Sequence, residues 1–295
     1  MSVALVTGAG GFLGRALVPA LVSAGWEVLA VARRPAHGAR GVRRLSVDLA
    51  RAAPDHQAEL LVHLACPSRE QMASDPDAVH TLAAIDANVI EAARRASQVV
   101  LISSAAVYGD RIADGSRASS ALPLAPSSRY GRAKVEQEER WRAAIPGARL
   151  LVVRLFNATG PGEPPTLVGR ATADRLCAAE PAATFAVRSS ESVRDFLDVR
   201  DAAAAVAALV AEGGAGTVDA CSGAATSVRT LVERLVAVSG RPVRIVPDGR
   251  GAESRSVGDP SELHRRLAWR PRWDLEASMR AVWAEAALAA GRREA

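Results

Sequence analysis

The sequence predicts an α/β protein with a doubly wound parallel sheet and a smaller C-terminal α/β lobe. Short apolar runs alternate with stretches of helical spacing as far as Leu155, and a glycine-rich turn follows the first run. Buried parallel strands are continuous apolar runs, and their alternation with helices is typical of βαβ units. Beyond Thr159 the alternation loosens, which indicates a second and smaller unit.

The first strand is expected at 3–6, an apolar run that ends at Thr7-Gly8. The first helix is expected at 12–24, because its apolar residues recur at helical spacing and Gly25 is a good C-terminal signal. The further strands are expected at 26–32, 43–47, 60–65, 99–103, 149–155, 217–220 and 243–246. The further helices are expected at 77–96, 129–143, 199–211, 228–239, 260–267 and 275–290. Residues 160–165 are too rich in Gly and Pro for a helix or a central strand.

The composition narrows the class of partner. The net charge is +5, but no basic run exceeds two residues, so a nucleic-acid partner is not expected. No apolar run approaches the ~20 residues of a membrane span, and no signal peptide is expected before the first strand. Cys66, Cys177 and Cys221 are few and far apart, which favours a reducing compartment, and we expect a cytoplasmic protein. The five histidines do not cluster at ligand spacing, so we assign no metal.

The turn after the first strand carries glycines at Gly8, Gly11 and Gly14, with Phe12 and Leu13 between them. A strand, a glycine turn and a helix in this order place backbone N–H groups against a pyrophosphate, as in a Rossmann-type dinucleotide site. No Gly-Lys-Ser/Thr follows, so the turn is not a P-loop. The alternative is a tight turn that is merely rich in glycine.

The end of the second predicted strand favours NADP(H) as the cofactor. Ala32 stands where an acid would bind the ribose 2′-OH, and Arg33 and Arg34 follow it, which suits a 2′-phosphate. The alternative is that both arginines are solvated surface cations. After the third strand, Asp48 is either an adenine contact or a helix N-cap. Leu49, and after the fourth strand Leu64 and Ala65, complete the expected cofactor site.

Lys134 is the only lysine among 37 basic residues, and it lies four residues after Tyr130, one of only two tyrosines. Residues i and i+4 share a helix face, so a phenol and an ammonium lie together. A nearby cation favours the phenolate, and we expect it to lower the pKa of Tyr130 and to create an acid–base group. The alternative is a helix that carries one Tyr and one Lys on its surface.

These features occur within a larger set of motifs. They are T-G-A-G-G-F-L-G at 7–14, V-H-L-A-C at 62–66, S-S-A-A-V-Y-G at 103–109, Y-G-R-A-K at 130–134, R-L-F-N-A-T-G-P-G at 154–162, R-D-F-L-D-V-R-D at 194–201, and D-P-S and L-A-W-R-P near the end. As a set they resemble the extended short-chain dehydrogenase/reductases, the NAD(P)-dependent epimerase/dehydratase and nucleotide-sugar group. The resemblance covers nearly the whole chain. It departs from the family pattern at Cys66, Thr159 and Asp198, where Ala, Tyr and His are usual.

The resemblance implies the roles of the catalytic residues and the division of the chain. Ser104 would hold the substrate oxygen, Tyr130 would carry the proton, and Lys134 would tune Tyr130 while gripping the nicotinamide ribose. A reduced carbonyl becomes an alkoxide that must be protonated in place, so the residue chemistry agrees. We expect an NADP-binding Rossmann domain over 1–160, to which 195–220 returns, and a substrate-binding lobe over 161–194 and 221–295.

Ala105 and Ala106 reduce the number of reaction types to be considered. Sugar 4,6-dehydratases of this family have Asp and Glu at the positions of Ala105 and Ala106, and uronate decarboxylases have Glu at the position of Ala106. Elimination of water needs such a general acid and base. An NADPH-dependent ketoreductase acting on a nucleotide-activated 4-keto-6-deoxy sugar, or on a polyketide carbonyl, is therefore the leading interpretation. The alternatives are an NAD-dependent nucleotide-sugar 4-epimerase and a non-catalytic NADP-binding sensor.

The resemblance also suggests substrate contacts for the small-molecule ketone. Asn157, Arg194 and either Arg250 or Arg255 match positions that commonly touch a nucleotide diphosphate, and Arg forks suit phosphate. Arg194 could instead pair with Asp195 or Asp198, and Asn157 could only cap a loop. Ser68 is a sugar contact or loop filler. Many relatives dimerise through two helices, which here are 77–96 and 129–143, so a homodimer is expected.

Overall fold

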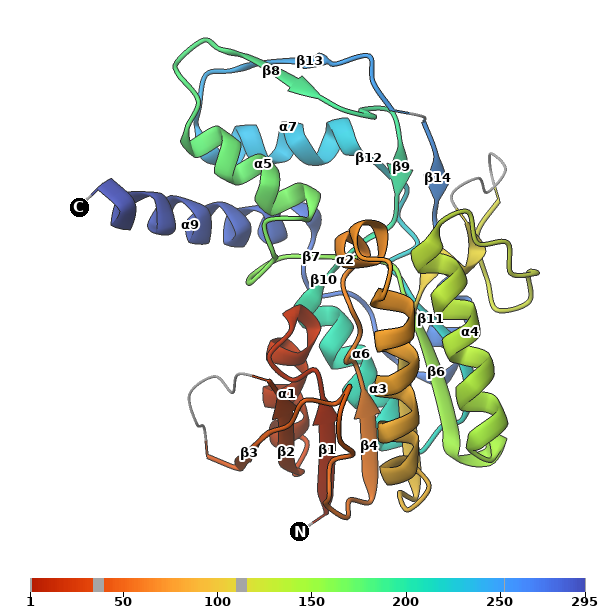
Figure 1. Cartoon of the computed structure of the whole chain (residues 1–295). Helices are drawn as coiled ribbons and strands as arrows, with labels where there is room; N and C mark the ends of the chain where they lie inside the picture. Colours follow the sequence, from red (N-terminus) through yellow and green to blue (C-terminus); the bar gives the residue numbers. More distant parts are fainter. Residues whose placement is uncertain (1, 34–39, 110–115, 252, 295) are drawn as a thin grey trace.

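The computed structural model describes residues 2–33, 40–109, 116–251 and 253–294, and its centre is a seven-stranded sheet (Figure 1). The strand order is β11-β6-β5-β4-β1-β2-β3, and every pairing is parallel. The strands are β1 (Val3–Thr7), β2 (Glu27–Ala32), β3 (Val42–Ser46), β4 (Leu60–His63), β5 (Gln98–Ser104), β6 (Leu150–Leu155) and β11 (Gly216–Ala220). The predicted doubly wound Rossmann-type sheet is confirmed.

Helices cover both faces of this sheet. On one face α1 (Phe12–Ser23) packs against α6 (Val199–Glu212), and their aliphatic side chains share a core with β1, β4 and β6. On the other face α3 (Ala78–Ala93) and α4 (Arg129–Ala144) enclose a second core that includes Trp141. Successive side chains of a strand point to opposite faces of the sheet, so alternating residues of the buried strands pack into the two cores.

Strand order reverses on either side of β1, because β2 and β3 lie to one side and β4, β5 and β6 to the other. In open parallel sheets, ligands bind at the carboxyl edge beside such a reversal. The loops after β1, β2 and β4 meet there. The fold therefore places the glycine turn and the ends of these strands at one site.

The C-terminal lobe lies beyond the carboxyl edge of the sheet, at the top of Figure 1. Its core joins α5 (Val168–Cys177), α7 (Val228–Ser239) and α9 (Leu275–Glu294) with β8 (Thr184–Val187) and β13 (Arg244–Pro247). The smaller strands near the lobe are β7 (Asn157–Thr159), β9 (Val193–Arg194), β10 (Phe196–Asp198), β12 (Thr226–Ser227) and β14 (Arg255–Ser256). The short helix α8 (Ser261–Arg266) instead places Leu263 in the core that α1 and α6 share with the sheet.

Most predicted elements differ from the observed ones by one to three residues at an end. The sequence missed α2 (Arg69–Ser74) and α5, and it missed the short strands of the lobe. Two short 3-10 turns, η1 (Ala105–Tyr108) and η2 (Gly147–Arg149), flank α4 in the chain. Across the described ranges, no helix combines the length and apolar character that crossing a lipid bilayer would require.

Gly131 permits the close approach of α4 to η1. A Cβ at this position would lie 2.4 Å from the carbonyl oxygen of Ala106 and 3.0 Å from the side chain of Pro126. Ser128 caps the helix by accepting a hydrogen bond from the Gly131 N–H at 3.0 Å. The start of α4 is thus fixed against the end of β5.

Replacing Gly131 by Ala is expected to destabilise the protein, although Ala favours a helix by up to ~1 kcal/mol. The clash with a backbone carbonyl should outweigh this gain and lower the free energy of unfolding by roughly 1–3 kcal/mol. Urea unfolding measures the change. Gly291, in α9 with open space around its Cβ position, is the matched control. Equal effects of the two replacements would contradict the interpretation.

Candidate active site

Two adjoining clefts open at the carboxyl edge of the sheet. The first, of about 860 Å³, lies among the glycine turn and the ends of β2, β3 and β4. The second, of about 530 Å³, runs from the glycine turn past the end of β5 to the lobe. They share Gly8, Gly11, Leu64 and Cys66. An extended ligand can therefore lie across both.

The glycine turn leaves no room for side chains where it meets β4. Gly8 has a positive φ of 67°, and a Cβ there would lie 2.8 Å from the Ala65 backbone nitrogen. At Gly14 a Cβ would lie 2.4 Å from the Gly8 carbonyl oxygen. Gly11 is the N-cap of α1, no side chain caps this helix, and its first turn has no acidic residue. The backbone N–H groups of that turn therefore suit a pyrophosphate.

The expected cofactor residues fall along both clefts. Those that line the first cleft are Gly8, Gly11, Arg33, Asp48, Leu49, Leu64 and Ala65. Those that line the second, besides the shared ones, are Phe12, Leu13, Gly14, Tyr130 and Lys134. Arg34 lies outside the described residues. The N-cap alternative for Asp48 is wrong, because its carboxylate accepts from the Ala50 N–H within a turn and no helix begins there.

Ser104, Tyr130 and Lys134 all line the second cleft. Ser104 ends β5, and its hydroxyl accepts a hydrogen bond from the Ala106 N–H at 3.2 Å as η1 begins. Tyr130 lies in the first turn of α4 and Lys134 one turn later. The close approach of α4 to η1 thus brings a hydroxyl, a phenol and an ammonium to one wall.

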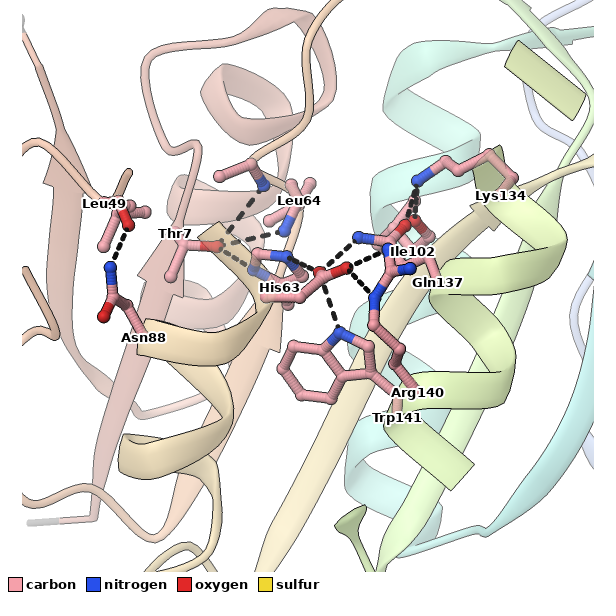
Figure 2. A network of polar contacts seen from close by, with 12 residues as sticks. Thr7, Leu49, His63, Leu64, Asn88, Ile102, Lys134, Gln137, Arg140 and Trp141 are labelled. Atoms are coloured by element: carbon pink, nitrogen blue, oxygen red, sulfur yellow. Dashed lines mark hydrogen bonds and ion pairs between the residues drawn. The ribbon is translucent and has the colours of Figure 1, made fainter. Parts of the chain in front are cut away.

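Lys134 is nearly inaccessible, with 3% of its surface exposed. Its Nζ donates to the Ile102 carbonyl oxygen at 2.9 Å and to Gln137 Oε1 at 2.7 Å (Figure 2). Burial disfavours the ammonium, but interactions with Cys66, Tyr130 and the carboxylates Asp86 and Glu138 together raise the pKa of Lys134 above its ordinary value. Lys134 is therefore held as a cation.

The expected lowering of the Tyr130 pKa is wrong for the protein alone. Burial raises the pKa of Tyr130, and this effect outweighs the opposing charges of Lys134 and Arg69 and the hydroxyl of Ser104. Sequence spacing gave the sign of the lysine contribution but carried no information on desolvation, which disfavours the phenolate. In the protein alone Tyr130 is thus a proton donor.

The loop after β4 holds the predicted contact Ser68 and also Arg69, a cleft residue that the sequence analysis missed. Ser68 lines the second cleft and is also the N-cap of α2, where it forms a capping box with Gln71. Next to it, Arg69 lines the same cleft with its guanidinium carbon 5.5 Å from the Tyr130 ring centroid. The signal for α2 was readable as Ser-x-x-Gln. The contact of Arg69 with Tyr130 was not, because the two lie on different elements.

The expected substrate contacts separate in the structure. Asn157 and Arg194 line the second cleft, whereas Arg250 is exposed beside Asp248 and lines neither cleft. Asn157 donates to the Asp195 carbonyl oxygen at 3.1 Å, and Arg194 donates to the carbonyl oxygen and hydroxyl of Ser254.

The carboxylates proposed as alternative partners of Arg194 accept hydrogen bonds from other donors. Asp195 accepts from the backbone N–H groups of Ser222, Gly223 and Gly258. Asp198 forms an ion pair with Arg200 at 2.8 Å.

Glu163 is a second residue that the sequence analysis missed. Its buried carboxylate lines the second cleft and accepts from the Thr159 hydroxyl at 2.6 Å and from the N–H groups of Gly160, Gly169 and Arg170. Burial raises its pKa, which these donors oppose. Thr159, where the family usually has Tyr, thus fixes the loop that leads into α5. Within the described parts of the chain, no three His, Cys, Asp or Glu side chains form a group that could hold a metal ion.

The chain is similar to known proteins in both sequence and structure. The sequence model of the NAD dependent epimerase/dehydratase family matches residues 4–219. The chain is 31% identical over 299 residues to the dTDP-6-deoxy-L-talose 4-dehydrogenase (NAD(P)(+)) of Kitasatospora kifunensis, a match that covers 94% of this chain and 93% of that protein.

Two further matches come from Pseudomonas aeruginosa. The chain is 33% identical over 198 residues to the GDP-6-deoxy-D-mannose reductase, covering 61% of this chain and 63% of that protein. The structure of RMD complexed with NADPH matches with a TM-score of 0.82 at 25% identity, over 98% of this chain and 100% of that one.

Replacing Arg69 by Gln is expected to raise the pKa of Tyr130, because a cation beside the ring favours the phenolate. With [13Cζ]tyrosine the chain gives only two resonances, from Tyr108 and Tyr130. At a fixed alkaline pH the Tyr130 phenolate fraction should fall in the variant. Arg132→Gln, which removes an exposed cation from the same helix, should leave it unchanged. An unchanged fraction in Arg69→Gln would rule out the contact as a source of charge stabilisation.

Proposed function

The chain belongs to the NAD dependent epimerase/dehydratase family, and we propose that it is an NADPH-dependent ketoreductase of a nucleotide-activated 4-keto-6-deoxy sugar. One observation carries the proposal. Ser104, Tyr130 and Lys134 line a single cleft with the glycine turn, while Ala105 and Ala106 beside them present neither an acid nor a base. This set suits hydride and proton transfer to a carbonyl, and it lacks the groups for elimination of water.

The carboxylates of the cleft support the same choice. Among the described residues that line it, the carboxylates are Glu70 and Glu163. Glu70 is exposed in the first turn of α2. Glu163 already accepts four hydrogen bonds that fix the loop before α5. Neither is placed as the free acid–base group that a dehydratase needs.

Each catalytic side chain has a separate task in the proposed reaction. NADPH, when bound, supplies the hydride. The Ser104 hydroxyl donates a hydrogen bond to the substrate oxygen, and Tyr130 gives that oxygen its phenolic proton. The raised pKa of Tyr130 keeps the phenol protonated before the reaction. The Lys134 cation then stabilises the phenolate that remains.

The substrate class rests on the relatives and on the second cleft. The name of the Kitasatospora kifunensis relative describes oxidation at carbon 4 of a nucleotide 6-deoxy sugar, which is the reverse of the proposed reduction. Arg194 and Asn157, which both line the second cleft, would bind the diphosphate. In this proposal the substrate-binding lobe is 161–194 with 221–295, and the NADP-binding domain is 1–160 with 195–220.

Three further expectations stay predictions. Arg250 as a substrate contact would require a movement of its loop toward the second cleft. A homodimer through α3 and α4 is testable by sedimentation. The cytoplasmic location awaits fractionation of cells.

The test of function is NADPH oxidation with a nucleotide-linked 4-keto-6-deoxy sugar. Tyr130→Phe should lower kcat by roughly 10²-fold or more while NADPH still binds, because only the proton donor is removed. Tyr108→Phe, which removes the other phenol of the chain, should leave kcat close to that of the wild type, since Tyr108 does not line the cleft and the Glu138–Arg154 ion pair that holds α4 on the sheet stays in place.

Three results would each contradict the proposed function. Full activity of Tyr130→Phe would exclude the proposed acid. Isolation of the protein with stoichiometric, tightly held NAD would favour the 4-epimerase. If the protein reduced polyketide carbonyls and no nucleotide sugar, the substrate would be a polyketide ketone and not a sugar.

Arg33 is expected to supply part of the preference for NADPH. It lines the first cleft at the end of β2, where a 2′-phosphate would lie. Arg33→Ala should lower the ratio of kcat/KM for NADPH to that for NADH by about 10-fold, the scale of one charge-assisted hydrogen bond. Arg43→Ala removes an exposed arginine from β3, and Arg43 is not among the residues that line either cleft. A ratio that falls equally in both variants would show only a general electrostatic effect.

A further inference from the structure

A chain of buried polar side chains connects Lys134 to the turn after β1 (Figure 2). Its centre is Asp86 of α3, whose exposed fraction is 0%. Asp86 Oδ1 accepts from Gln137 Nε2 at 2.7 Å and from Trp141 Nε1 at 2.9 Å. Asp86 Oδ2 accepts from Arg140 Nη2 at 2.7 Å and from Arg140 Nε at 3.1 Å. One carboxylate thus receives four donors from a single face of α4.

The other end of this chain reaches the glycine turn through His63. His63 Nε2 lies 3.3 Å from Asp86 Oδ1, and His63 Nδ1 lies 2.7 Å from Thr7 Oγ1. Thr7 Oγ1 accepts from the N–H groups of Leu64 and Ala65, so its own proton is left for His63 Nδ1. Nδ1 is then the acceptor, and the proton of a neutral imidazole resides on Nε2, which lies near Asp86 Oδ1 but is not aligned for a hydrogen bond with it. Burial lowers the pKa of His63 and favours this neutral form.

Asp86 decides which end of the Gln137 amide faces Lys134. An ionised carboxylate only accepts hydrogen bonds, so the amide must turn its NH₂ group toward Asp86. Its oxygen then points to the Lys134 ammonium, to which it lies at 2.7 Å. The opposite orientation would set an amide donor against an ammonium and a carbonyl oxygen against a carboxylate. Hydrogen bonds to Lys134 and to Asp86 therefore fix the orientation of the Gln137 amide, which a hydrogen bond on one side alone would not determine.

The fixed amide leaves one ammonium proton, and the side chain of Cys66, which also interacts with the ammonium, lines both clefts. Lys134 has three N–H donors, of which the Ile102 carbonyl and Gln137 Oε1 occupy two. Both acceptors are held, one in β5 and the other by Asp86. The third donor direction is consequently set by the protein before any ligand binds.

We propose that Asp86 is a positioning residue for the reaction, which acts through Gln137 to orient the Lys134 ammonium in the second cleft. The catalytic part rests on the proposed function, whereas the orientation of Lys134 does not. Asp86 touches neither cleft, because it is not among the residues that line them. Its effect on the reaction reaches Lys134 in two ways, through the hydrogen-bonded Gln137 amide and through the charge of the carboxylate itself.

The single lysine of the chain allows a direct test without substrate. In tag-free protein labelled with [13Cε]lysine, the only resonance reports the titration of Lys134. Gln137→Met removes the oxygen acceptor at similar side-chain length, so the pKa of Lys134 should fall below its wild-type value. Asp86→Asn should move it in the same direction, because the Asp86 carboxylate favours the ammonium.

Trp141→Phe is the matched control. It removes another donor to Asp86 Oδ1 and opens a gap in the same core, but it leaves Gln137 bonded to Asp86. It should lower the stability and leave the Lys134 titration unchanged. A merely structural role of the network predicts that Trp141→Phe and Gln137→Met alter the titration alike, and this result would overturn the proposal.

Kinetics complete the test. In Gln137→Met, kcat for ketone reduction should fall by about 10-fold or more, the scale of a hydrogen bond to a charged group, while KM for the ketone changes little. In Trp141→Phe, kcat should stay within about 2-fold. If Asp86→Asn does not fold, Gln137→Met decides alone. A shifted titration in a protein that reduces no ketone would refute the proposed function and keep the positioning role, and an unshifted titration in an active reductase would do the reverse.

Discussion

The burial of one ammonium constrains the arrangement of the whole site. A lysine withdrawn from water loses hydration that only fixed acceptors and carboxylates can replace. Lys134 obtains them from the Ile102 carbonyl of β5, from Gln137 on its own helix, and from the charge of Asp86 on α3. The strand and both helices must therefore hold their relative positions for the cation to persist. An arginine with its broad planar fork does not fit between such closely placed acceptors.

The buried face of α4 continues this polar character toward the other half of the sheet. Next to Gln137, Glu138 accepts from the Ser103 hydroxyl at 2.6 Å and from Arg154 of β6 through both carboxylate oxygens. Arg154 also donates to the Tyr108 hydroxyl, which donates to Asp219 of β11. Removing one partner of such a buried pair leaves an uncompensated charge, so the network fixes the register of α4 on the sheet. That register, together with the close approach at Gly131, places Tyr130 beside Ser104.

The sequence predicted the first half of the fold well because its signals there are local. Apolar runs, the glycine turn and helical spacing each depend on residues that are neighbours in the chain. In the lobe, α5 has no side-chain N-cap, and its first N–H groups are met by Glu163 from the preceding loop. Its Gly169 weakens the helical signal, yet a Cβ there would meet that same carboxylate. Such a helix is stabilised by tertiary contacts with α7 and α9, which propensity does not report.

The sequence by itself determined the parallel sheet, the glycine turn and the presence of a serine, a tyrosine and a lysine suited to carbonyl chemistry. It also determined, through Ala105 and Ala106, which groups are missing beside them. Only the tertiary structure decided the protonation balance of Tyr130, the contact with Arg69 and the orientation of the Gln137 amide. The physical reason is that desolvation and hydrogen-bond direction depend on segments that are distant in the chain, so no spacing rule contains them.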